Sequence, residues 1–122
     1  MIFLTGKVVP GFGHFVPRMT KFSQAFKNAT GQNLIPDTLN VKMEGEIPIR
    51  EHFRIRGTEI GEPEQDLLFE VCRANGIWAY WIRPYNLRTR GGGHGDNTLE
   101  IACSQKIPYV RGLVEIALFR DN

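Results

Sequence analysis

Apolar and polar residues alternate along most of this chain with the two-residue period of β-strands. Seven short segments have this alternation or a continuous β-branched and aromatic run, and each is flanked by glycine, proline or asparagine on at least one side. They span residues 2–9, 39–43, 53–56, 67–74, 77–82, 98–103 and 113–119. The dipeptide Asn75-Gly76 separates the fourth and fifth segments. It predicts a two-residue hairpin, because both residues tolerate positive φ angles.

One segment has a helical period instead. It begins at Pro17, which suits a first helical turn, and ends before Gly31, which suits the position just past a helix. The apolar positions expected on its buried face are Met19, Phe22, Phe26 and Ala29, and the polar positions expected to face water are Arg18, Lys21, Gln24 and Asn28. Six or seven strands with one short helix predict a mainly β fold, a small closed barrel, because closure removes exposed sheet edges.

Composition narrows the class of protein. A chain of 122 residues is one ordinary domain, and we assign residues 1–122 to it. The net charge of +2 gives no strongly cationic surface for duplex nucleic acid. No apolar run is long enough to span a membrane, and the first residues lack the features of a secretory signal. Cys72 and Cys103 match no zinc or redox spacing, so we expect free thiols in a cytoplasmic protein.

Two segments contain residue types suited to phosphate or metal chemistry. The turn Gly11-Phe12-Gly13 leads into the predicted helix, and glycines let backbone N–H groups approach an anion. A plain connecting turn is the alternative interpretation. In Pro36-Asp37-Thr38-Leu39-Asn40, Thr38 and Asn40 are two residues apart and point to the same face of a strand. Their oxygens are hard ligands of the kind Mg²⁺ accepts; the alternative is a turn with local backbone bonds.

Two further segments are candidates for ligand contacts. Residues 88–96, with sequence Arg-Thr-Arg-Gly-Gly-Gly-His-Gly-Asp, form either a mobile loop or one that closes on an anionic ligand. In the fifth strand, Trp78, Tyr80 and Ile82 alternate with Ala79, Trp81 and Arg83. One face of that strand is expected to fill the core, and the aromatic residues of the other are candidates to stack on a base or a flavin.

Taken in order, these segments resemble the CTP-dependent riboflavin kinases of archaeal type. The resemblance rests on Gly6-Lys7-Val8-Val9-Pro10-Gly11-Phe12-Gly13, the helix, and Pro36-Asp37-Thr38-Leu39-Asn40-Val41. It continues through residues 72–84, 99–102 and 112–116, so it covers nearly the whole chain. It implies a six-stranded cradle-loop barrel that transfers a phosphoryl group from CTP to the 5′-hydroxyl of riboflavin, giving FMN and CDP.

The resemblance also implies a set of site residues. The nucleotide-binding positions would be Gly11, Phe12, Gly13, His14 and Phe15 together with Gln105, Lys106, Ile107 and Pro108. Thr38 and Asn40 would bind Mg²⁺, and Thr89 and Glu100 would contact the flavin. It names no general base.

The chain departs from the family pattern in three places. The family turn runs Gly-x-Gly-Glu-Gly, whereas here His14-Phe15 follows Gly13; Asp37 replaces a glycine, and Arg90 replaces a histidine. The altered turn favours a second hypothesis, a barrel that binds flavin or nucleotide without catalysis. A third hypothesis is single-stranded nucleic-acid binding through the aromatic strand and the arginines of residues 88–96.

Overall fold

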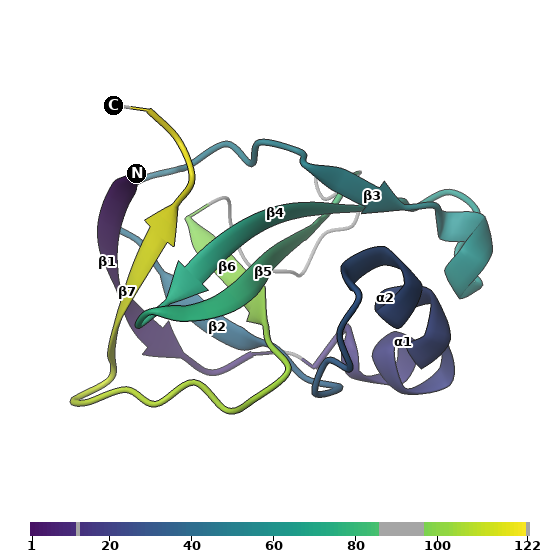
Figure 1. The fold of residues 1–122 in the computed structure, drawn as a ribbon, viewed down its shortest axis with the longest axis horizontal. Coiled ribbons are helices and arrows are strands. Elements are labelled where there is room, and N and C mark those ends of the chain that lie inside the picture. The colour runs from purple at the N-terminus through teal and green to yellow at the C-terminus, as the bar shows by residue number, and fades with distance from the viewer. Residues whose placement is uncertain (12, 86–96, 122) are drawn as a thin grey trace.

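A computed structural model describes residues 1–11, 13–85 and 97–121. Within these residues the chain forms seven strands, two short helices and one 3₁₀ helix (Figure 1). They are β1 (Ile2–Val9), α1 (Val16–Lys21), α2 (Ser23–Thr30), β2 (Leu39–Lys42), β3 (Phe53–Ile55), the 3₁₀ helix (Gly57–Ile60), β4 (Leu67–Ala74), β5 (Ile77–Pro84), β6 (Thr98–Ala102) and β7 (Leu113–Leu118). Every strand expected from the sequence is therefore present.

Six of the strands close into an antiparallel barrel, as the sequence predicts. The ring runs β1, β2, β6, β5, β4 and β7, and β7 returns to β1. β3 lies outside the ring and pairs only with β4. The expected hairpin joins β4 to β5: Asn75 and Gly76 both have positive φ, 48° and 81°. Both chain ends lie on the side of the barrel away from α1 and α2 (Figure 1).

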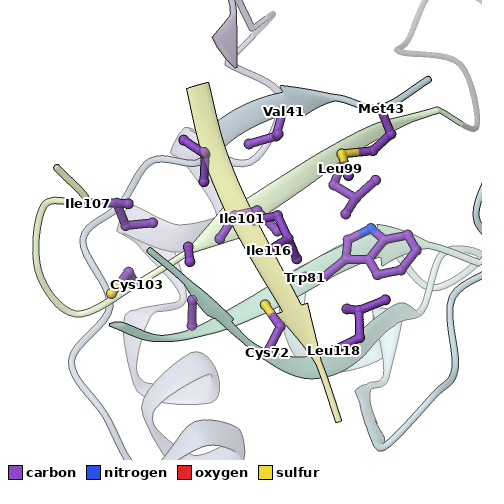
Figure 2. Packing of buried hydrophobic residues seen from close by; sticks show 13 residues of the cluster. Val41, Met43, Cys72, Trp81, Leu99, Ile101, Cys103, Ile107, Ile116 and Leu118 are labelled. Carbon is purple, nitrogen blue, oxygen red and sulfur yellow. The ribbon is translucent and has the colours of Figure 1, made fainter. Parts of the chain in front are cut away.

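The barrel interior forms the first of two cores. Alternate residues of the ring strands meet there, with Trp81 as the largest side chain and Val41, Leu99, Ile101 and Ile116 around it (Figure 2). A fully buried Val, Leu or Ile contributes about 1.5–3 kcal/mol, so the closed interior contributes strongly to stability.

Both cysteines belong to the interior core, and both are free and buried, as the sequence predicts. Burial raises the pKa of the Cys72 thiol to about 12, because a thiolate there would lose its hydration. Cys72 is therefore a neutral packing residue.

The second core lies outside the barrel, between the helices and the outer faces of β3, β4 and β5. Phe26 of α2 meets the edge of the Phe69 ring, which stacks on Phe53 with centroids 4.8 Å apart. Tyr80 completes this aromatic group, and its hydroxyl donates to the carbonyl of Thr30 at 3.2 Å. The two helices are thereby fixed against the sheet.

The predicted helix differs from the structure in two respects. It is interrupted at Phe22, whose backbone (φ −114°, ψ 36°) leaves the helical region, so two helices form in place of one. Arg18, expected to face water, is buried and lies over the Phe15 ring at 5.3 Å. Gly31 ends α2 in the left-handed conformation, as predicted.

The aromatic strand β5 offers no open stacking face of the kind expected from the sequence. Trp81 lies in the barrel interior, and Tyr80 and Ile82 lie beneath the helices, each no more than 3% exposed. The face of β5 that was expected to stack on a flat ligand is instead packed against the helices in the second core. Trp78 alone among these is half-exposed, and it packs against Phe119.

Among the described residues, no helix has the length and apolar character that crossing a membrane requires.

Candidate functional site

The structure brings the glycine turn and the Thr38–Asn40 segment together at one end of the barrel. Val9, the last residue of β1, pairs with Asn40 on β2, and the chain then passes over the Asn40 side chain at Gly11. A Cβ added at Gly11 would lie 2.0 Å from Nδ2 of Asn40. A side chain at position 11 would therefore force the Asn40 amide to shift.

Asn40 has the environment of a ligand-binding side chain. It is only 6% exposed, and its Nδ2 donates a long hydrogen bond of 3.3 Å to the carbonyl of Thr38. Its Oδ1 is buried and accepts no hydrogen bond from any residue that the structure describes. A buried carbonyl oxygen without a donor costs free energy, so a cation or a donor from a ligand would stabilise it.

A cavity of about 310 Å³ opens beside this strand. Thr38 and Asp37 lie on its wall together with Gln105, Lys106 and Ile107. Two segments assigned separately to metal and nucleotide by the family resemblance thus line one space. The lining also includes the apolar residues Leu39, Ile101 and Cys103. A cavity that combines apolar and polar lining residues has the character of a small-molecule site.

Glu100 lies across the strand pair from Asn40. The two residues are register partners of β6 and β2, so their side chains emerge on the same face. Burial raises the pKa of the Glu100 carboxyl to about 7, and the positive charges of Arg18 and Arg83 act in the opposite direction. No group within residues 1–11, 13–85 and 97–121 donates a hydrogen bond to this carboxyl.

The other residues of the predicted nucleotide turn have different surroundings. Gly13 has a φ of +69° and has open space where a Cβ would lie, and His14 is exposed. Phe15 is 1% exposed and its ring belongs to the second core, so only its backbone remains available to a phosphate. Phe12 lies outside the described residues.

Two further predicted positions are not brought to the site. Pro108 does not line the cavity; its carbonyl accepts a hydrogen bond of 2.6 Å from Asn75 at the β4–β5 hairpin. Thr89, with the whole segment 88–96, lies outside the described residues, and its assignment stays a prediction.

The oxygen donors fit a hard cation better than a transition metal. No group of three or more His, Cys, Asp or Glu side chains suited to a metal occurs in the part of the chain that the structure describes. The Oδ1 of Asn40 and the hydroxyl of Thr38 are hard oxygens. Asp37, which lines the cavity together with Thr38, adds negative charge. Mg²⁺ uses few protein ligands of this type and takes the rest from water and phosphate.

Sequence reasoning missed the burial of Arg18. It assigned this charged residue to the solvent face, whereas the structure buries Arg18 against the second core. The nearest sequence signal is Phe15 three residues earlier, a spacing at which a guanidinium can lie over a ring.

No protein-family model and no curated protein matches this chain.

Proposed function

We propose that this protein is a riboflavin kinase, which transfers the terminal phosphoryl group of a nucleoside triphosphate, CTP by the family resemblance, to the 5′-hydroxyl of riboflavin. The bond from the γ-phosphorus to its bridging oxygen breaks, and a bond to the ribityl oxygen forms. The products are FMN and CDP, and the hydroxyl proton is released to solvent.

The contact between Gly11 and Asn40 carries this proposal. It puts a turn that suits phosphate next to a buried amide oxygen without a donor, and these are the two components that binding a metal–polyphosphate needs. Phosphoryl transfer depends on positioning and charge neutralisation rather than on a reactive side chain. A site built from a glycine turn and oxygen ligands for a cation therefore has the groups that phosphoryl transfer requires.

Each part of the site has a role in the proposed reaction. Asn40 and Thr38 would hold Mg²⁺, which when bound neutralises charge on the polyphosphate. The cavity beside Gln105, Lys106 and Ile107 would receive the cytosine ring, because it adjoins Thr38. Glu100, across the strand from Asn40, would accept a hydrogen bond from the flavin on the same face.

FMN formation tests the function directly. Purified protein is incubated with riboflavin, Mg²⁺ and each of CTP, ATP, GTP and UTP, and the flavins are separated by chromatography. We expect FMN, with CTP as the preferred donor. If riboflavin and CTP bind but no FMN forms, the barrel is a binding module, the alternative that the altered glycine turn favours.

Asn40→Ala tests the metal site. We expect it to lower Mg²⁺-dependent turnover by about a hundredfold, the scale seen when a single stabilising contact is removed from a transition state. The unfolding transition should change little, since the lost oxygen accepts no hydrogen bond from the described residues. Asn28→Ala, at an exposed position on α2, is the matched control. Turnover of Asn40→Ala equal to that of Asn28→Ala would remove Asn40 from the site.

A further inference from the structure

Tyr109 is an exposed aromatic side chain in the lining of the cavity beside Thr38. It is 44% exposed, and it lines this cavity together with Ile35, which is 41% exposed. Within the described residues, the Tyr109 ring meets no other aromatic ring and no cation, and its hydroxyl makes no hydrogen bond. Single exposed apolar side chains are common on protein surfaces, but two beside one cavity are typical of ligand pockets, which are lined mainly by hydrophobic and aromatic side chains.

The backbone on both sides of Tyr109 is held in place. The carbonyl of Pro108, just before it, accepts a hydrogen bond of 2.6 Å from the Asn75 side chain. Val110, just after it, forms a β-bridge with Leu113. A ring on a fixed backbone loses little more than the rotation of its own side chain when a ligand stacks on it. The cost of ordering Tyr109 against a flat ligand is therefore small.

The cavity is connected through Thr38 to the end of the site that is suited to phosphate. Thr38 lines the cavity with Tyr109, and its carbonyl accepts the hydrogen bond from Nδ2 of Asn40. Asn40 in turn lies against Gly11. A nucleotide with its phosphates at Gly11 and Asn40 would extend past Thr38 to bring its base into this cavity.

We propose that Tyr109 stacks on the base of the nucleotide and supplies binding affinity that does not depend on which base is present. This inference rests on the proposed function and adds to its site the residue that holds the base. Every base has a π face, so an aromatic ring stacks on all of them. The preference for one nucleoside triphosphate over another then depends on hydrogen bonds to the edge of the base, and not on Tyr109.

Calorimetry with Mg²⁺ and without riboflavin compares CTP with inorganic tripolyphosphate, which has the phosphates but no nucleoside. We expect Tyr109→Ala to weaken CTP binding by about fivefold to 150-fold, the range for one base stacked on an aromatic side chain. Tripolyphosphate affinity should change by less than about twofold. UTP and ATP should lose affinity by a factor similar to that for CTP. A loss confined to CTP would indicate a contact with the edge of the base and would overturn the proposal.

Tyr109→Phe and Tyr85→Ala are the matched variants. Tyr109→Phe keeps the ring and loses a hydroxyl that has no partner among the described residues, so we expect CTP affinity within about twofold of the wild type. Tyr85 is 61% exposed, lies under the Arg54 guanidinium and is not among the described residues that line the cavity, so Tyr85→Ala should also bind CTP as the wild type does. If Tyr109→Ala binds CTP as tightly as Tyr85→Ala, or Tyr109→Phe binds it as weakly as Tyr109→Ala, the proposal is wrong.

The same titrations separate failure of this inference from failure of the proposed function. A wild type that binds neither CTP nor tripolyphosphate contradicts both. A wild type that binds CTP and tripolyphosphate with equal affinity contradicts only the stacking on Tyr109, because the nucleoside then adds nothing to binding. A wild type that binds CTP through Tyr109 but forms no FMN contradicts only the kinase function.

Discussion

Glu70 on β4 and Glu100 on β6 are both shielded from water, but their surroundings differ. Arg120 donates to both carboxylate oxygens of Glu70, at 2.5 and 2.8 Å, and the backbone N–H of Arg50 donates a third hydrogen bond at 2.8 Å. Glu100 receives no hydrogen bond from the described residues, and the charges of Arg18 and Arg83 act on it. Of these two carboxylates, Glu70 alone is hydrogen-bonded by the part of the chain that the structure describes.

The difference separates a structural region from a functional one. Glu70 ties the C-terminal segment to the barrel, because Arg120 also donates to the carbonyl of Pro48. Around Glu100, the residues that the structure describes give no hydrogen-bond donor to the Glu100 carboxyl or to the Oδ1 of Asn40. Polar groups left in this state on one face are expected where a ligand completes the bonding, and this cost in stability is typical of functional sites.

The largest effect on stability is expected when Glu70 loses its partner Arg120. Arg120→Met leaves Glu70, which is 0% exposed, as an isolated buried charge, and we expect the free energy of unfolding to fall by about 3–5 kcal/mol. Urea denaturation measures this loss. Arg73→Met, which removes an exposed arginine over the Phe119 ring, is the control and should cost less than about 1 kcal/mol. Equal losses in the two variants would show that the buried Glu70–Arg120 pair contributes no more to the free energy of unfolding than an exposed arginine does.

Substitution of Glu100 is expected to have a smaller effect on the free energy of unfolding, and one of opposite sign. The folded pKa of Glu100 is about 7, above the ordinary 4.5, so the folded state retains its proton over this interval. The unfolding free energy of the wild type therefore falls as pH rises from about 4.5 to 7. Glu100→Gln should remove this loss. We expect it to be up to about 3 kcal/mol more stable than the wild type at pH 8 and equal to it near pH 4.

Denaturation curves of wild type and Glu100→Gln across this pH range give the difference. Glu115→Gln, at an exposed position on β7, should show no pH-dependent change relative to the wild type. If the difference in unfolding free energy between wild type and Glu100→Gln stays constant with pH, burial does not raise the pKa of Glu100. The contrast drawn here between Glu100 and Glu70 would then be wrong.

The smallest effect on stability is expected at Gly11. Gly11→Ala forces the Asn40 amide to move, because the new Cβ would lie 2.0 Å from its Nδ2. We expect a cost of about 1 kcal/mol in stability but about a tenfold loss of tripolyphosphate affinity, since the phosphate-facing turn and the amide shift together. Gly45→Ala, where a Cβ meets nothing within 4 Å, is the control. Unchanged tripolyphosphate affinity in Gly11→Ala would separate this turn from the phosphate.

The sequence predicts the barrel well because its signals are local. Strand alternation, the Asn75-Gly76 turn and the Gly31 helix end each depend on a few neighbouring residues. That the glycine turn and the Thr38–Asn40 segment share a site was an expectation from the family resemblance and not from a local pattern, and the structure places Gly11 against Asn40.

What the sequence leaves open depends on contacts between distant residues. Arg120 pairs with Glu70 across 50 positions, and no local pattern indicates it. The raised pKa of Glu100 depends on how deeply β6 is covered, and the burial of Arg18 depends on how α1 packs against the second core. Partnered and incompletely bonded charges look alike in a sequence, and only their three-dimensional surroundings separate them.

The central claim is that one ligand-binding face joins Gly11, Asn40 and Glu100. A crystal structure of the protein with CDP, Mg²⁺ and FMN tests it most directly. We predict a cation against the Oδ1 of Asn40, the diphosphate beside Gly11, and the ribityl end of the flavin on the Glu100 side. Ligands bound on another face, or Asn40 and Glu100 unchanged in contacts at saturating ligand, would contradict the account.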